Sequence, residues 1–245
     1  MKNKIIYIFV ISFIFSSNTD IIKIVDQLNY FGQYDEELYE LEKAIQIYPD
    51  NIELLWRLSR AHFEIADQSD SKEIHRKHFY PALNYARSAL DLNSNSAIAN
   101  HWYSVLIGKI GLLEGTEQKI KNSYDVKKHA LKAIDLDPTN DGTYHVLGRW
   151  YFEVASLSWI ERKMAEIIYT KPPVGTYDEA IFYFKKAIEI KNDEIRHYYW
   201  IAKTYIAMNK FDQAKKYLNE IINLEPIDDS DKKMKLESLE LLKDV

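Results

Sequence analysis

The chain has 245 residues, of which 47% are hydrophobic and 28% charged, a composition that is typical of globular proteins and excludes a disordered one. It contains no cysteine, so disulfide scaffolds, thiolate metal sites and cysteine nucleophiles are excluded. Seven glycines and six prolines are too few for the tight turns of a sandwich or barrel, and the net charge of −5 disfavours nucleic acid as a partner.

The first 17 residues have the order of a secretory signal peptide. Lys2 and Lys4 precede an apolar run over residues 5–15, and Ser16 and Ser17 follow it. The run is shorter than the ~20 residues that a membrane-spanning helix needs. The alternative interpretation is a buried first helix. We expect residues 1–17 to be removed and residues 18–245 to form one exported domain, periplasmic or extracellular, without a transmembrane segment.

The remainder of the chain repeats a helical hairpin. Residues 195–228 have the spacing of a tetratricopeptide (TPR) unit, with the small residue Ala202 where its two helices cross. The end of this unit recurs upstream, at residues 43–51, 88–96, 132–140 and 186–193. The sequence therefore predicts an all-α, TPR-like helical-hairpin solenoid of about five hairpins.

Two helices are expected outside these hairpins. Residues 229–245 predict a short amphipathic helix that caps the last hairpin. Residues 156–175 form an insert, after which Thr176 and Glu179 match a capping box. The insert carries an apolar stripe made of Trp159, Ile160, Met164, Ile167 and Ile168. We expect the stripe to be buried and to close one end of a groove, so that Trp159→Ala costs ~3–5 kcal/mol; the alternative is a surface for a membrane or partner.

A TPR solenoid binds partners in the concave groove that the first helices of its hairpins line. Lys and Arg outnumber Asp and Glu at those repeat positions and aromatic residues are frequent, so we expect a basic and aromatic groove. The predicted ligand-binding residues are Trp56, Arg57, Arg60, His101, Trp102, Lys109, His145, Arg149, Phe152, Tyr199, Trp200 and Lys203. For any one of them, the alternative is a packing or ion-pair contact. We expect solvated cations, whose replacement changes stability by ~0.5 kcal/mol or less.

One stretch goes beyond the general TPR pattern. It is LGRWYFEVASLSWIERK at residues 147–163, and residues 99–108, 114–115, 119–124, 172–173 and 176–180 accompany it. With them, residues 97–190 resemble the TPR domain of the regulator of microtubule dynamics family. The resemblance implies a non-enzymatic all-α solenoid, and members are linked to microtubules, organelle contact sites and phospholipid binding. Animal members have a membrane anchor and long linkers before this domain, so only the fold and an amphipathic ligand are carried over.

No catalytic or metal-binding constellation is recognisable. His75 and His78 lie three residues apart without a third ligand, and there is no Gly-rich phosphate loop or nucleophile elbow. We therefore predict a non-enzymatic, exported scaffold, without cofactor or metal, that binds a protein or peptide in its groove. The alternative is a phospholipid-binding or lipid-transfer module that uses the same groove, and a degenerate enzyme is a third class.

Overall fold

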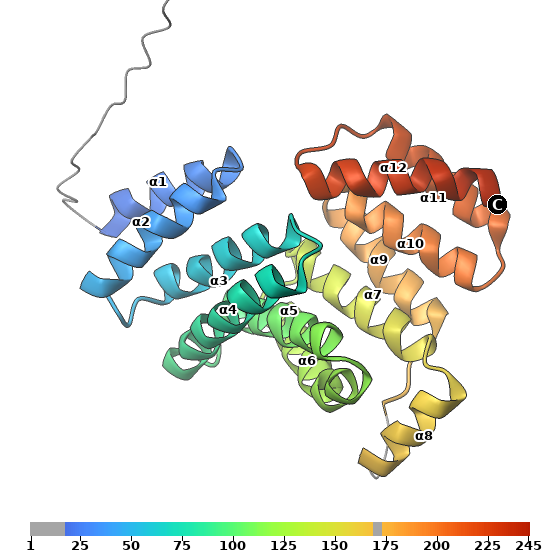
Figure 1. The fold of residues 1–245 in the computed structure, drawn as a ribbon, viewed down its shortest axis with the longest axis horizontal. Coiled ribbons are helices and arrows are strands. Elements are labelled where there is room, and N and C mark those ends of the chain that lie inside the picture. Colours follow the sequence, from blue (N-terminus) through green and yellow to red (C-terminus); the bar gives the residue numbers. More distant parts are fainter. Residues whose placement is uncertain (1–17, 169–172) are drawn as a thin grey trace, which may run out of the picture.

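The computed structural model describes residues 18–168 and 173–245, in which all regular secondary structure is helical (Figure 1). The helices of these ranges are α1 (Asn18–Tyr30), α2 (Tyr34–Ile47), α3 (Ile52–Asp67), α4 (Lys72–Leu92), α5 (Ala97–Glu114), α6 (Thr116–Leu136), α7 (Asp141–Ala155), α8 (Trp159–Ile168), α9 (Tyr177–Ile190), α10 (Ile195–Ala207), α11 (Phe211–Asn223) and α12 (Asp229–Asp244). None of these helices is both long and apolar enough to cross a membrane. The predicted signal segment, residues 1–17, lies outside the described residues.

The predicted solenoid is confirmed. Successive antiparallel pairs, α1–α2, α3–α4, α5–α6, α7–α9 and α10–α11, stack in chain order, and α12 packs on the last pair (Figure 1). Asn51, Ser96 and Asn140 cap α3, α5 and α7 by accepting hydrogen bonds from backbone N–H groups. Thr176 and Glu179 form the predicted capping box of α9. These caps restart the helices at equivalent points of the repeat, so the first helix of each hairpin faces the same side.

Helix crossings within a hairpin depend on small residues. Gly148 of α7 lies directly on the ring of Phe184 in α9, and both are buried. Ala202 of α10 and Ala214 of α11 are fully buried in the same way in the last hairpin. Contacts within and between hairpins therefore fill the interior. The concave faces of the first helices remain available for a binding site.

Arg57 and Arg60 of α3 join the first two hairpins. Asp26 of α1 accepts hydrogen bonds from both guanidinium groups at 2.6 to 3.0 Å, and Glu37 of α2 accepts one from Arg60 at 2.7 Å. The side chain of Arg57 is only 8% exposed, and it also pairs with Glu53 at 2.7 Å. The expectation of a solvated Arg57 is therefore wrong, because α1 packs on α3 and its carboxylate enters the space where a ligand was expected.

Helix α8 projects from the solenoid (Figure 1). Of its apolar stripe, Trp159, Ile160 and Ile167 are exposed, and Met164 and Ile168 are half-buried. Trp159 is 72% exposed and Ile167 is 85% exposed, whereas Ala165 is buried. Arg162 fixes the start of α8 by donating to the carbonyl oxygen of Ala155 at 3.1 Å. The expectation that the stripe is buried and closes the groove is wrong, because the side of α8 that meets the solenoid is the one that carries Ala165.

We expect Trp159→Ala to lower the free energy of unfolding by less than about 0.5 kcal/mol, because an exposed side chain leaves no cavity. The matched control is Trp150→Phe. Trp150 is buried and its indole N–H donates to the carbonyl oxygen of Ser123 at 2.7 Å, so this variant should lose about 1–3 kcal/mol. Urea denaturation measures both. A loss of several kcal/mol in Trp159→Ala would show that α8 packs on the solenoid.

Candidate ligand-binding cavity

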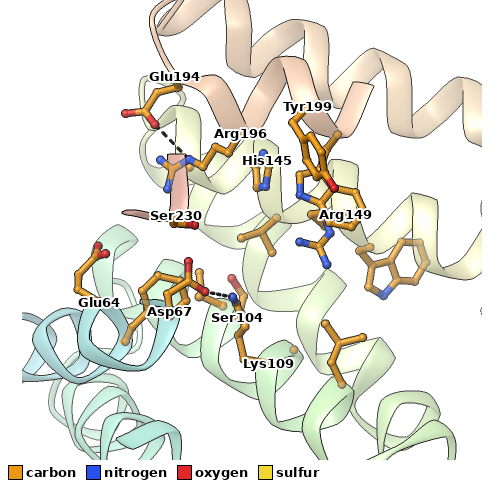
Figure 2. A pocket seen from close by; sticks show the side chains of 18 of the residues that line it. Glu64, Asp67, Ser104, Lys109, His145, Arg149, Glu194, Arg196, Tyr199 and Ser230 are labelled. Atoms are coloured by element: carbon orange, nitrogen blue, oxygen red, sulfur yellow. Dashed lines mark hydrogen bonds and ion pairs between the residues drawn. The ribbon is translucent and has the colours of Figure 1, made fainter. Parts of the chain in front are cut away.

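A cavity of about 980 Å³ occupies the concave side of the solenoid (Figure 2). Its walls come from α3, α5, α7 and α10, which are first helices of hairpins, and from α6. Residues 227–237, which lead into and begin α12, supply a further wall. Lys233 of α12 pairs with Asp70, beyond the end of α3, at 2.5 Å. The expected groove is thus a half-open cavity, bridged on its open side by the C-terminal segment.

The cavity is amphipathic along α7. Asp141, His145 and Arg149 line it between residues 141 and 149, and Val154 lines it near the end, beside Glu153. Apolar side chains of α5, α6 and the segments that flank α8 continue the apolar part. They are Leu112, Ile120, Val126, Leu157 and Pro173. A ligand that matches this lining has a polar end and an apolar end.

The lining carries more acidic than basic residues. The carboxylates are Glu64, Asp67, Asp70, Asp141, Glu153, Glu194, Asp228, Asp229, Asp231 and Glu237, and the cations are Lys109, Lys119, Arg149, Lys191, Arg196 and Lys233. Burial raises the pKa of Glu64 to about 7, so its negative charge is partial near neutral pH. The expectation of a basic lining is wrong. Asp67, Asp141 and Glu194, at or beside the ends of first helices, already balance the cations, and residues 227–237 add four more carboxylates.

Arg149 is the least neutralised cation of the cavity. Its nearest carboxylate oxygen, Oε1 of Glu153, lies 3.8 Å away, and its guanidinium lies 3.4 Å from the ring centre of Trp200. Burial lowers the pKa of Arg149. Figure 2 shows its side chain extending into the cavity from α7. A half-buried guanidinium stacked on an indole with little ionic compensation is suited to binding an anion.

The other cations have closer partners. Lys109 is hydrogen-bonded to Asp67, Lys119 lies 3.3 Å from Glu153, and Arg196 lies 3.4 Å from Glu194. Lys191 and Lys233 are paired with Glu194 and Asp70, respectively. Arg149 therefore has the strongest remaining demand for an anionic partner.

Polar atoms without partners gather at this cavity. Six buried side-chain atoms in residues 18–168 and 173–245 have no hydrogen-bond partner, and all but the Nε of Arg60 belong to residues that line it. They are Gln68 Nε2, Trp102 Nε1, Ser123 Oγ, Arg149 Nε and Arg196 Nε. Nearly all are donors only, and a buried donor without an acceptor is costly. These unpartnered donors add to the polar character of the cavity wall.

A hydrogen-bonded chain leads from Asp141 to the cavity wall. Asp141 Oδ2 lies 2.9 Å from Nε2 of His197, and Nδ1 of His197 lies 3.0 Å from Nδ1 of His145. Burial opposes ionisation of Asp141, but the hydrogen bond from His197 and the charge of Arg196 lower its pKa to about 2. Burial lowers the pKa of both histidines. The chain therefore consists of a carboxylate and two neutral imidazoles at neutral pH.

The predicted ligand-binding residues divide into two groups. Those that line the cavity are His101, Trp102, Lys109, His145, Arg149, Tyr199 and Trp200. Those that lie outside it are Trp56, Arg57, Arg60, Phe152 and Lys203. The rings of the second group pack under cations or other rings: Trp56 lies 4.0 Å below Arg57, and Phe152 packs on Trp200 at 5.4 Å. Lys203 donates to the Tyr199 hydroxyl at 3.3 Å.

The sequence did not point to several groups of cavity residues, among them Asn29, Tyr30 and Tyr34 of the first hairpin. Residues 227–237 belong to no hairpin, so no repeat position points to them. Ile120, Ser123 and Val126 lie on α6, a second helix, which reaches the cavity because α5 and α6 extend beyond the length of a standard unit. Among the described residues, no group of three or more His, Asp or Glu side chains could hold a metal ion.

A family model described as Regulator of microtubule dynamics protein 1-3 matches residues 21–245. Regulator of microtubule dynamics protein 1 of Bos taurus is 33% identical over 228 residues, which cover 91% of this chain and 72% of the relative. The protein of that name from Caenorhabditis elegans is 30% identical over 217 residues, which cover 89% of this chain and 96% of the relative. The match is wider than the expected residues 97–190.

Solved structures share the fold. A thermophilic TPR protein of Thermus thermophilus superposes with a TM-score of 0.66 at 16% identity, over 91% of this chain and 99% of that chain. PilF of Pseudomonas aeruginosa gives a TM-score of 0.55 at 14% identity, over 92% of this chain and 84% of that chain. These similarities show the TPR-like solenoid.

Proposed function

The chain belongs to the regulator of microtubule dynamics family, and on this basis we propose that it is a non-enzymatic binding module whose cavity holds one amphipathic, anionic ligand of the phospholipid class. TPR-like folds are typical of protein-interaction modules. The finer proposal rests on the cavity, which has a polar part, an apolar part and a volume of about 980 Å³, within the range of small-molecule sites.

One observation carries the proposal. Arg149 lines the cavity, stacked on Trp200, with its Nε unpartnered and its nearest carboxylate 3.8 Å away. A phosphate group provides acceptor oxygens in the geometry that a guanidinium binds best. The apolar end, around Val154 and Leu157, lies one to two turns further along the chain and suits an acyl chain.

An extended acidic peptide is the second candidate, because peptides use the concave face of TPR solenoids. Residues 227–237 of the chain itself already lie along this face and bring Asp228, Asp229 and Asp231 to it. A second acidic segment in the same place would meet these carboxylates. This arrangement favours a ligand that enters beneath the segment.

The proposal is tested with dodecyl phosphate as probe, by calorimetry on the purified chain. We expect one molecule to bind and Arg149→Met to weaken binding at least about ten-fold, since a charge-assisted hydrogen-bonded contact is lost. Arg87→Met, on the exposed side of α4, is the matched control and should bind like the wild type. Native mass spectrometry of the wild type should also reveal a retained lipid. Absence of binding, or equal binding by both variants, would refute the proposal.

We propose in addition that the domain acts after export, so that the microtubule role in the relatives' name is not carried over to it. The support is the basic, apolar and polar order of residues 1–17. Protein recovered from the source cell should begin near Asn18 in N-terminal sequencing. Soluble cytoplasmic protein that retains Met1 would contradict this.

A further inference from the structure

The hydrogen-bonded series Asp141–His197–His145 ends at the cavity. At that end, Nε2 of His145 has not yet been assigned as a donor or an acceptor. His145 lines the cavity, and its Nδ1 faces His197. No hydrogen bond joins its Nε2 to residues 18–168 and 173–245, and the residue is only half-buried at the cavity wall. Whether this nitrogen donates or accepts decides what it recognises.

The hydrogen-bonding rules of imidazole settle the assignment. A carboxylate only accepts, so His197 must donate from Nε2 to Asp141. A neutral imidazole has a single N–H, so Nδ1 of His197 is an acceptor. Nδ1 of His145 lies 3.0 Å from it and must donate. The proton of His145 is therefore on Nδ1, and its Nε2 presents a bare lone pair.

That lone pair stands next to the anion-binding cation. His145 and Arg149 are four residues apart on α7 and so lie on one face of the helix, and both line the cavity (Figure 2). Arg149 supplies donors and His145 an acceptor. A ligand with only an anionic group satisfies the donors of Arg149, but the lone pair on Nε2 of His145 repels it.

We infer that the cavity selects a phosphate ester that carries a hydroxyl donor beside its phosphate, with Arg149 binding the phosphate and His145 Nε2 accepting from the hydroxyl. Asp141 and His197 are positioning residues that fix the tautomer of His145. The inference rests on the proposed function for its anionic ligand, whereas the tautomer follows from the hydrogen bonds between Asp141, His197 and His145 with both imidazoles neutral.

The tautomers are tested without any ligand, by long-range proton–nitrogen NMR of the labelled full chain. We expect unprotonated Nε2 in His145 and unprotonated Nδ1 in His197. Asp141→Ala removes the acceptor and should mix the tautomers of both rings. Glu194→Gln is the matched control: it removes the other carboxylate of Arg196, 3.4 Å away, and should leave the tautomers unchanged. A wild-type His145 protonated at Nε2 would overturn the inference.

Selectivity is tested with two probes of equal charge: 1-lauroyl-glycerol 3-phosphate and its 2-O-methyl ether, which cannot donate. We expect the wild type to prefer the free hydroxyl about five- to ten-fold, as one hydrogen bond allows, and His145→Phe to bind both alike. Equal binding of both probes by the wild type would overturn the inference while leaving anion binding intact. If neither probe binds to the wild type, the proposed function and the inferred selectivity both fail, although the tautomers measured by NMR are unaffected.

Discussion

Replacement of Arg60 by Met should lower the free energy of unfolding by about 3–5 kcal/mol, the loss expected when one partner of a buried ion pair is removed. Glu37 is fully buried, and its carboxylate accepts hydrogen bonds from Arg60 at 2.7 Å and from Asn29 at 2.9 Å. Without the guanidinium, a carboxylate with a single amide partner stays in the interface between the first two hairpins. Guanidinium chloride denaturation, monitored by circular dichroism, measures the loss.

The loss should shrink as the pH falls. Burial raises the pKa of Glu37, although Arg60 acts to lower it. At pH values between the ordinary carboxyl pKa and this raised pKa, Glu37 is protonated in the folded state and ionised in the unfolded state. Stability therefore decreases as pH rises above the ordinary carboxyl range, and removal of Arg60 strengthens this dependence.

Arg60→Met with Glu37→Gln should recover much of the stability at neutral pH. Arg76→Met, which breaks an exposed pair with Glu114, is the control and should have little effect. A pH-independent loss would argue against an ionised, buried Glu37.

Gly148→Ala should cost about 3 kcal/mol, the upper end of the range for overpacked cores. A Cβ at this position would lie 2.6 Å from two ring atoms of Phe184, which is fully buried and has no free space to move into. The hairpin α7–α9 must then separate at its crossing. Because α7 also carries His145 and Arg149, binding of dodecyl phosphate should weaken together with thermal stability.

Gly108→Ala is the matched control within the same architecture. Its added Cβ would meet Val126 at 3.6 Å, an ordinary contact, and alanine is favoured over glycine inside a helix by about 1 kcal/mol. This variant should be as stable as the wild type or more so. Similar melting temperatures for both variants would show that the contact between Gly148 and Phe184 is not tight.

The sequence predicts the parts of this molecule that repeat. Recurring helix ends give the five hairpins, the Thr176–Glu179 pair gives the start of α9, and the repeat positions place His145, Arg149 and Trp200 on the concave side. Each of these follows from local rules: capping chemistry, helical periodicity and the need for small residues at crossings.

The features that depend on contacts distant in sequence could not be predicted in this way. Arg57 has the repeat position of a groove residue, yet α1 brings Asp26 to it. The amphipathic pattern of α12 predicts that it covers α11, but not that Lys233 reaches Asp70, 163 residues away. The stripe of α8 predicts an apolar face and leaves open what meets it, and Trp159 in fact faces solvent.

The contact between Lys233 and Asp70 changes the mechanics of the solenoid. An open TPR solenoid can change its curvature to fit a bound partner. Here Lys233 of the last helix pairs with Asp70 of the second hairpin, and this ion pair bridges the open side of the cavity. The side chains of Lys233 and Asp70 are both exposed, so dissolved salt readily screens the attraction between their charges. We therefore expect the proposed anionic ligand to dissociate faster in concentrated salt, both because this ion pair opens more often and because its own contact with Arg149 is screened.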